Sequence, residues 1–421
     1  SLDSRCKSEY AVKHILVISF ILHSTLSVGQ QLSEQNWTNT RHQSYAQISG
    51  NGGFVSSGFH NSFINELMTK DVLSSEVRVE QLDGLNSFTR IGGDYNYGLS
   101  AGLSLKNQNH QLSVWVSDEA HAHGKIPKDL MSLGLFGNKG FAGDTAQIAN
   151  AELNLTRFQK FGIGWLYSPS EDVSIGLRLS VINAETLFEL HTRSTQLFTS
   201  ALGDTVYADV DAGGQFSDTA NIGFGKTNGG GAAVDVVYTQ FMGAEDDKWR
   251  LDLMVQNLSL VQWSPQSIQI DLDEKISFSG INVGDITQIE NQDFDLADSL
   301  QMEFEKATRY GTITRLLPGG MQAKISQIKA RGIEMEFGGA ARWNSGYLPY
   351  AWVASRFQFN ESVESGASVG YSGYAGLQVG LNAGYIGERI NAAIQVQNVD
   401  AILFGKTRAG AGIRLSIQYL W

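Results

Sequence analysis

The chain is poor in several residue types that other classes of protein need. It has one cysteine and only 5 prolines among 421 residues. Cys6 precedes the apolar run near the N-terminus, so the rest of the chain has no disulfide and no thiolate metal site. Charged residues make up 18%, and the net charge is −12. Nucleic-acid binding needs a basic surface, so nucleic acid is excluded as a partner.

The N-terminal segment has the three parts of a secretory signal peptide. Lys7 and Lys13 precede an apolar run from Ile15 to Leu22, and residues 27–29 (Ser-Val-Gly) supply a small-residue cleavage site. The run is shorter than the roughly 20 residues of a membrane-spanning helix. A buried N-terminal helix is the alternative interpretation. We expect residues 1–29 to be removed during export.

The body of the chain alternates apolar and polar residues with a period of two. Residues 99–105, 173–181, 249–255 and 377–385 all show this pattern, which is typical of a half-buried β-strand. Several such segments exceed the 5–6 residues common in soluble sheets and reach the roughly 9–11 needed to cross a bilayer. Aromatic residues gather near the segment ends, as in the interfacial girdles of membrane barrels. A soluble β-sandwich remains the alternative.

Short polar turns alternate along the chain with long connections at about 58–92, 118–150, 191–230 and 264–310. Outer-membrane barrels have short periplasmic turns and longer external loops. We therefore predict an all-β fold, a transmembrane antiparallel β-barrel of about 14 strands in the cell outer membrane, with both mature termini in the periplasm. The expected strands are 43–57, 93–105, 111–118, 151–168, 173–190, 231–242, 249–263, 311–327, 333–343, 348–359, 364–372, 375–386, 390–399 and 408–421.

Two parts of this barrel have further expectations. Residues 30–57 form either a periplasmic N-terminal segment that plugs the barrel or its first strand, and residues 58–421 form the barrel itself. Short helices are expected at 127–136 and at 296–309, the second lying over the barrel mouth.

The last expected strand carries a local signal. Ile413, Leu415, Ile417, Tyr419 and Trp421 alternate with polar residues, and the strand ends on an aromatic residue. This pattern resembles the C-terminal assembly signal that the outer-membrane insertion machinery reads. The alternative is a final strand that simply ends in tryptophan.

Several short motifs together indicate a family. They are Gly58-Phe59-His60-Asn61-Ser62-Phe63, Leu133 to Gly137-Asn138, residues 167–176 (Tyr-Ser-Pro-Ser-Glu-Asp-Val-Ser-Ile-Gly), Gln262-Trp263, Phe278-Ser279-Gly280 and Leu317-Pro318. In these motifs the chain resembles an uncharacterised family of Bacteroidota outer-membrane barrels, a domain of unknown function. That family is related in shape to the long-chain fatty-acid transporters and to the type IX secretion shuttle-protein barrels. The resemblance implies a barrel of this shape, and it offers no agreed substrate and no catalytic residues to carry over.

Two segments resemble the end of a phosphate-binding loop. Residues 225–227 and 405–407 both read Gly-Lys-Thr. A phosphate-binding loop also needs glycine five positions before the second glycine, where this chain has Ala220 and Asp400. We interpret both segments as loop residues at the ends of strands.

Two groups of residues could in principle bind a metal. Glu119, His121 and His123 have the period-two spacing that places three zinc ligands on one face of a strand. A polar strand end running into an external loop explains them more simply. Residues 271–300 are rich in the carboxylates that suit Ca²⁺, but their spacing does not match an EF-hand loop, and a solvated external loop is the simpler interpretation. We therefore predict no metal, cofactor or catalytic site.

The expected lining of the barrel is mostly glycine and serine, with the few charged residues Arg178, Arg250, Asp252, Glu334, Glu336 and Arg414. Open porins usually have 16–18 strands, so a smaller barrel suggests a filled lumen. One hypothesis is a transporter for hydrophobic or amphipathic compounds, with an apolar pocket beneath the loops. The other is a scaffold or accessory barrel of a larger outer-membrane complex, with a closed interior and an exposed apolar patch. The expected partners are outer-membrane lipid, the insertion machinery, and a hydrophobic small molecule or a second outer-membrane protein.

Overall fold

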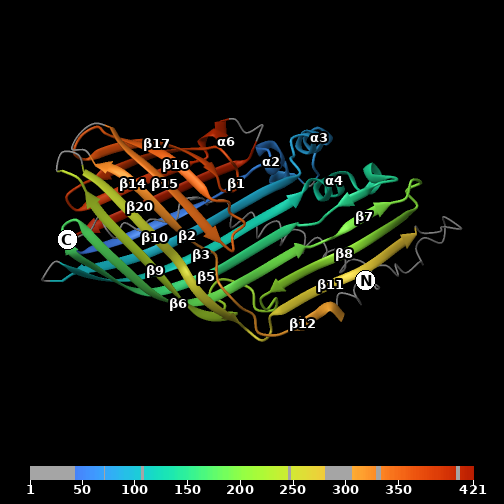
Figure 1. The fold of residues 1–421 in the computed structure, drawn as a ribbon, viewed down its shortest axis with the longest axis horizontal. Coiled ribbons are helices and arrows are strands. Elements are labelled where there is room, and N and C mark those ends of the chain that lie inside the picture. Colours follow the sequence, from blue (N-terminus) through green and yellow to red (C-terminus); the bar gives the residue numbers. More distant parts are fainter. Residues whose placement is uncertain are drawn as a thin grey trace.

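The computed structural model describes residues 43–70, 72–105, 109–244, 248–279, 306–328, 333–403 and 408–421. Within these ranges, fourteen antiparallel strands close into a barrel, as the sequence predicts (Figure 1). They are β1 (Tyr45–Ser56), β2 (Phe88–Ser104), β3 (His110–Pro127), β5 (Glu152–Ser170), β6 (Val173–Thr192), β9 (Gly229–Met242), β10 (Lys248–Trp263), β14 (Gly319–Ile328), β15 (Ile333–Trp343), β16 (Tyr350–Gln358), β17 (Val363–Ser372), β18 (Gln378–Ile386), β19 (Ile390–Gln397) and β20 (Gly410–Leu420).

Strand β1 closes the barrel between its first and last hairpins. Tyr45 pairs with Gly102 of β2 on one side and with Leu420 of β20 on the other. Residues 45–56 are thus a strand of the wall and not a plug. The expected signal peptide and the rest of the segment before residue 43 lie outside the described residues.

The outward face of the barrel is apolar and exposed. Ile163 and Val181 have 64% and 65% of their surface exposed, and other strands present Leu99, Leu381 and Ile417 in the same way. Alternation places these side chains outward and their polar neighbours in the lumen, which is the pattern required of a wall that faces lipid. Among the described residues, no helix is both long and apolar enough to cross a membrane.

Strand β3 is longer than the sequence indicates. The expected strand ends at residue 118, but β3 continues to Pro127 and pairs with both β2 and β5 as far as Lys125. Its second half alternates polar residues with alanine instead of large apolar residues, so it lacks the apolar signature of a strand. In the other direction, β14 begins at Gly319, later than the expected residue 311.

Two of the expected external loops contain strands that extend the sheet beyond the barrel. β8 (Thr205–Phe216) pairs with the end of β6, and β11 (Ile268–Ser279) pairs with β8 along its whole length. These strands project past the barrel mouth at the right of Figure 1. The shorter strands of this region are β4 (Thr145–Gln147), β7 (Gln196–Thr199), β12 (Thr308–Tyr310) and β13 (Thr314–Arg315).

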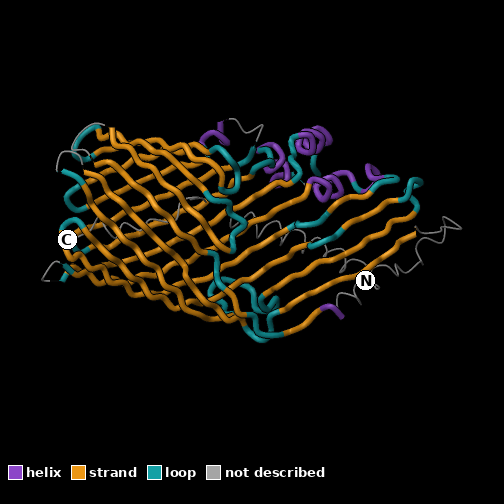
Figure 2. The backbone as a smooth tube through the Cα atoms, viewed as in Figure 1, coloured by secondary structure: helices purple, strands orange, loops and turns teal. Residues whose placement is uncertain are grey.

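Short helices gather at the same end of the barrel (Figure 2). They are α2 (Asn61–Thr69), α3 (Ser75–Asp83), α4 (Lys128–Phe136), the 3₁₀ helix η2 (Asn138–Phe141) and α6 (Val399–Leu403). Helix α4 matches the helix expected at 127–136, whereas most of the helix expected at 296–309 lies outside the described residues. Phe63 of α2 packs with Phe59, Ile91 and Ala409, which holds the helices against the barrel wall.

Candidate functional site

The lumen is bridged by an ion pair between opposite walls. Arg342 on β15 donates from Nη1 to both carboxylate oxygens of Asp94 on β2, each at 2.9 Å. Around the closed sheet, six strands separate β2 from β15 in one direction (β3, β5, β6, β9, β10, β14) and six in the other (β16, β17, β18, β19, β20, β1). Both side chains are buried. The pair therefore joins diametrically opposite strands.

His121 on β3 connects this pair to a second carboxylate. Its Nδ1 lies 3.0 Å from Asp94 Oδ1, and its Nε2 lies 3.8 Å from Glu119 Oε2. Because β3 pairs with β2 in the register that sets His121 opposite Asp94, both side chains point into the lumen at one height. The imidazole thus lies between two buried carboxylates.

A second bridge runs from β3 and β5 to β10. Lys160 Nζ lies 2.6 Å from Glu119 Oε1 and also donates to the Asn257 side chain, whose amide nitrogen lies 3.2 Å from Glu119 Oε2. Asn257 sits at a bulge in β10 with a φ of 56°, a conformation that asparagine tolerates better than most residues. The bulge aims its amide into the lumen. We call Asp94, Glu119, His121, Lys160, Asn257 and Arg342 the ion-pair layer.

Two connections that the sequence marks as short fold into the lumen beside this layer. Tyr347 precedes β16 and lies with its ring centre 4.8 Å from the Arg342 guanidinium carbon. Tyr374 follows β17, and its hydroxyl donates to the Ser345 carbonyl at 2.6 Å. Burial raises the pKa of both tyrosines, so both hydroxyls stay protonated at neutral pH and can donate. We call Tyr347, Tyr350, Trp352 and Tyr374 the aromatic cluster.

Glycines on both sides of the lumen make room for this packing. A Cβ atom on Gly92 of β2 would lie 2.3 Å from the Tyr374 ring. Gly346, with a φ of 60°, lies against the His123 ring of β3, where a Cβ atom would be 2.4 Å from the ring. The β15–β16 and β17–β18 connections therefore reach the wall formed by β2 and β3.

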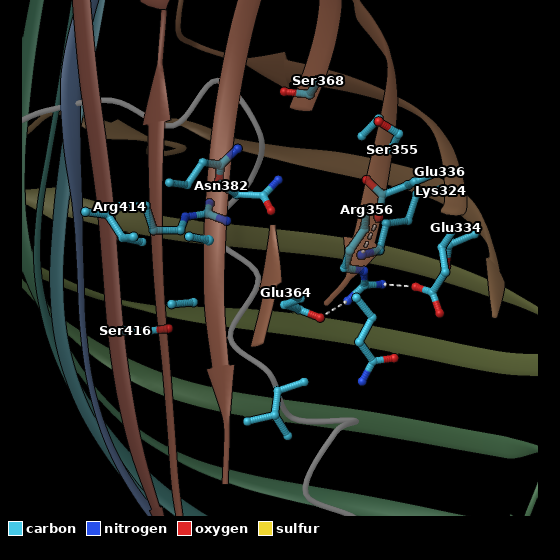
Figure 3. A pocket seen from close by; sticks show the side chains of 18 of the residues that line it. Lys324, Glu334, Glu336, Ser355, Arg356, Glu364, Ser368, Asn382, Arg414 and Ser416 are labelled. Atoms are coloured by element: carbon cyan, nitrogen blue, oxygen red, sulfur yellow. Dashed lines mark hydrogen bonds and ion pairs between the residues drawn. The ribbon is translucent and has the colours of Figure 1, made fainter. Parts of the chain in front are cut away.

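A cavity of about 550 Å³ lies in the half of the barrel nearer Trp421, where its lining includes Gln47 and Ser416. We call this the lower half, and the half toward the short helices the upper half. One wall of the cavity carries paired charges from β10 and β14–β17. Arg356 lies between Glu334 at 3.0 Å and Glu364 at 3.5 Å (Figure 3). Lys324 lies 3.4 Å from Glu336. We call this cavity the lower chamber.

The charged wall is tied to the aromatic cluster above it. The Trp352 indole donates from Nε1 to Glu336 Oε1 at 2.9 Å. On the other side of Lys324, Asp252 Oδ2 lies 3.8 Å from Lys324 Nζ. The same oxygen lies 2.8 Å from Arg250 Nε. The Trp352–Glu336 hydrogen bond therefore connects the lower chamber to the aromatic cluster.

The opposite wall of the lower chamber is made of amides and hydroxyls. It comes from β1 and from β17–β20 and includes Arg414, which faces the cavity together with Asn382 and Ser416 in Figure 3. Its polar residues are Gln47, Ser49, Asn51, Ser368, Asn382, Gln395 and Ser416.

The lining contains more charge than the sequence indicates. The six charged residues expected in the lumen do lie there: Arg178, Arg250, Asp252, Glu334, Glu336 and Arg414. The expectation that charges are few is wrong, because the lumen also holds Asp94, Glu119, Lys160, Asp235, Lys324, Arg342, Arg356 and Glu364. The signal for these residues is present, since each occupies an inward position of an alternating strand.

The candidate metal ligands on β3 are engaged in other interactions. Glu119 pairs with Lys160, His121 with Asp94, and His123 Nε2 lies 3.1 Å from the Asn154 amide nitrogen. In the part of the chain that the structure describes, no group of three or more possible ligands is arranged around a metal. The simpler interpretation, a strand end entering an external loop, is wrong as well, because these residues lie inside the barrel.

The other candidate segments lie in a loop or outside the residues that the structure describes. Residues 225–227 belong to the β8–β9 connection, where the Gly225 backbone N–H donates to Glu185 at 3.1 Å. Residues 404–407 and 280–305, which include the second Gly-Lys-Thr and most of the acidic segment, lie outside the described residues. Of the acidic residues described, Asp271 accepts a hydrogen bond from Arg193 at 2.7 Å.

The expected assembly-signal residues occupy β20 and the position after it. Leu415, Ile417, Tyr419 and Trp421 are exposed, and the rings of Tyr419 and Trp421 stack at 6.0 Å. The Trp421 backbone exchanges hydrogen bonds with Ser44, so both ends of the described chain meet at one rim of the barrel. Their recognition by the insertion machinery stays a prediction.

Comparison with known families identifies the group to which the chain belongs. The model of a family of unknown function (DUF5723) matches residues 40–395, which is most of the sequence. The chain is a member of this family. A family of unknown function was expected from the motifs, whereas an origin in Bacteroidota and a relation to secretion shuttle barrels stay predictions. No curated protein matches the sequence.

The chain is similar to several solved structures. The toluene transporter TbuX of Ralstonia pickettii is 6% identical, with 90% of this chain and 89% of that chain covered and a TM-score of 0.43. The toluene transporter TodX of Pseudomonas putida is 9% identical over the same shares, with a TM-score of 0.42. A FadL homologue of Pseudomonas aeruginosa is 7% identical over 90% of each chain, with a TM-score of 0.39. At these identities the likeness is one of fold.

Proposed function

We propose that the protein is an outer-membrane barrel of the transporter kind whose lumen is closed at the ion-pair layer. The observation that carries this proposal is the Asp94–Arg342 pair, which joins opposite walls above a cavity of about 550 Å³. A solute that moved along the barrel axis would have to pass this pair. Transport therefore requires the pair to separate, and the present arrangement is the closed state.

The placement in the outer membrane is supported by the wall of the barrel. Exposed outward side chains of several strands are apolar, while the inward side chains include the ion pairs, amides and hydroxyls of the lower chamber beside the buried aromatic cluster. The expected signal peptide supports export. The meeting of Ser44 and Trp421 at one rim supports an orientation in which both mature termini face the periplasm.

The cargo proposed here is amphipathic. Hydrophobic and amphipathic compounds are both expected from the sequence, and a purely hydrophobic cargo would need an apolar pocket. The lower chamber is lined instead by ion pairs and by amide and hydroxyl groups. Such a lining favours a cargo that has a polar part to place in it.

A scaffold or accessory barrel is the second candidate function. It is favoured by the bridged lumen and by exposed apolar side chains on the long external connections. Leu202, Ile222 and Phe224 have 88%, 71% and 75% of their surface exposed. Ile222 and Phe224 share the β8–β9 connection, whereas Leu202 lies in the β7–β8 turn. Exposed apolar patches on a protein surface mark interaction sites.

Native mass spectrometry of the full-length protein, gently extracted from its own membrane, tests these candidates. A retained amphipathic small molecule on a single barrel is the result expected for the transporter. A stoichiometric protein complex without a small ligand would contradict the transporter and favour the scaffold function. A protein that stays in solution without detergent would contradict the membrane barrel itself.

A further inference from the structure

We propose that the lower chamber binds a neutral, hydroxyl-rich group, such as a short sugar, carried by the amphipathic cargo. This inference rests on the proposed function and names the polar part of that cargo. It depends on three features of the chamber: its balanced charges, its wall of amides and hydroxyls, and its lack of an open sheet edge.

The charges of the chamber are balanced and are used in pairs. Arg356 lies within 3.5 Å of both Glu334 and Glu364, and Lys324 lies 3.4 Å from Glu336. Four cationic residues (Arg250, Lys324, Arg356, Arg414) and three anionic ones (Glu334, Glu336, Glu364) line the chamber. A fourth anion, Asp252, does not line it but lies 2.8 Å from Arg250 and 3.8 Å from Lys324, so the charges of the set balance.

A charged ligand would lose part of its hydration in this chamber and meet no excess of the opposite charge. Desolvation of an ion that gains no full counter-charge is costly. A neutral ligand carries no such cost and leaves the ion pairs intact. The charge balance therefore selects against carboxylates, phosphates and amines as the bound group.

The opposite wall suits groups that both donate and accept hydrogen bonds. Asn51 of β1, Asn382 of β18 and Gln395 of β19 each present an amide with two donor hydrogens and an acceptor oxygen. Ser49 and Ser416 add hydroxyls that can serve in either role. A sugar hydroxyl also donates and accepts, and the carboxylates of the charged wall can accept from it as well.

An extended peptide fits the chamber less well. Peptides commonly bind by adding a strand to an exposed sheet edge. The strands around the chamber are each paired on both sides, from β14 round to β1, so they offer no free edge. Recognition here must come from side chains alone. The volume of about 550 Å³ is within the usual range of small-molecule sites.

The test is a titration of the full-length protein with maltose, in a polyoxyethylene detergent because sugar-based detergents would compete. Decanoate is the matched probe with a charged head. We expect saturable maltose binding that is unchanged between low and high salt, and weaker binding of decanoate. Trp352, which donates to Glu336 at 2.9 Å, should report maltose through its fluorescence, and Trp352→Phe should remove that signal.

One pair of variants separates a binding role from a structural one. Asn382→Leu should weaken maltose binding about tenfold, since it removes a polar partner of the bound group. Asn391→Leu is the control, because Asn391 faces the lumen on the next strand but does not line the chamber. It should bind maltose like the wild type. Equal weakening in both variants would overturn the assignment.

Other outcomes overturn the inference without touching the proposed function. Absence of saturable maltose binding, or decanoate binding that is tighter and falls with salt, would contradict a neutral site while leaving a gated barrel in place. Conversely, maltose binding to a barrel whose Arg342→Ala variant stays closed while folded would support the site and contradict gated transport.

Discussion

The two halves of the lumen are built from the same strands but are filled differently. On β15, Arg342 reaches across to the opposite wall, whereas Glu336, six residues below it, pairs with a neighbouring strand. On β2, Asp94 receives that cross-barrel bond, whereas the inward positions below it are Asn96, Gly98, Ser100 and Gly102. Strand geometry is the same in both halves. The size and charge of the inward side chains therefore decide where opposite walls meet.

The aromatic cluster strengthens this contrast. In the upper half, Tyr374 from one wall fills the space left by Gly92 on the other. In the lower half, ion pairs such as Arg356–Glu364 run along one wall and leave the centre as a cavity. Closure should thus depend on a few contacts of the upper half and should be insensitive to the lower half.

The largest effect is expected from Arg342→Ala. This change leaves the buried Asp94 carboxylate without the guanidinium that it accepts from, so the free energy of unfolding should fall by about 3–5 kcal/mol. Arg356→Ala is the control: its side chain is 44% exposed in the chamber, and its loss should cost at most about 1 kcal/mol. Denaturant unfolding in detergent measures both. Equal losses would mean that the two halves do not differ in this way.

Gly92→Ala should have the next largest effect. Its Cβ atom would lie 2.3 Å from the Tyr374 ring, which has to move, at a cost of about 1–3 kcal/mol. Gly98→Ala on the same face of β2 is the matched control, since the nearest atom there is 3.4 Å away. Thermal unfolding of the two variants compares them directly. A destabilised Gly98→Ala beside a neutral Gly92→Ala would show that the ring does not fill the upper half.

A smaller effect is expected from Tyr374→Phe, which removes the 2.6 Å hydrogen bond to Ser345 and should cost about 1 kcal/mol. The stability that the Tyr374 hydroxyl contributes should fall at alkaline pH. Burial raises the folded-state pKa of Tyr374 above its ordinary value near 10. Its contribution is therefore full below that value and is lost as the pH rises through the raised pKa. Unfolding measured from neutral to alkaline pH should show a steeper decline in wild type than in Tyr374→Phe.

The smallest effect on closure is expected from Trp421→Ala, because Trp421 lies at the lower rim and its side chain faces outward. The proposed assembly signal predicts less heat-modifiable barrel in the outer membrane, with signal cleavage unchanged. Protein that does assemble should be as closed as the wild type. Normal assembly of this variant would count against the signal, and a leaky assembled barrel would count against the separation of the two halves.

The strands could be predicted from the sequence because each carries its own period-two pattern. The ion-pair layer could not, because it depends on which strands face each other across the barrel. Asp94 and Arg342 are 248 positions apart, and neither has a neighbour in sequence that indicates the other. Only the strand order and register bring them to one height.

Strands β8 and β11 were missed for a different reason. Both alternate: Val206, Ala208 and Val210 occupy every second position of β8, and Ile268, Ile270 and Leu272 do so in β11. Their other positions are mixed and include Asp209 and Asp211 in β8 and Asp271 and Asp273 in β11. The acidic residues of 271–300 favour a solvated loop when the sequence is taken alone. The two strands nevertheless pair with each other, and β8 pairs with β6, so the alternation was the more informative signal.

The central claim is that the Asp94–Arg342 bridge closes the lumen, and current through single barrels in a planar lipid bilayer tests it most directly. We expect no steady current from the wild type or from Arg356→Ala, and frequent openings from Arg342→Ala. A wild-type barrel that conducts steadily, or an Arg342→Ala barrel that stays closed while folded, would contradict the claim.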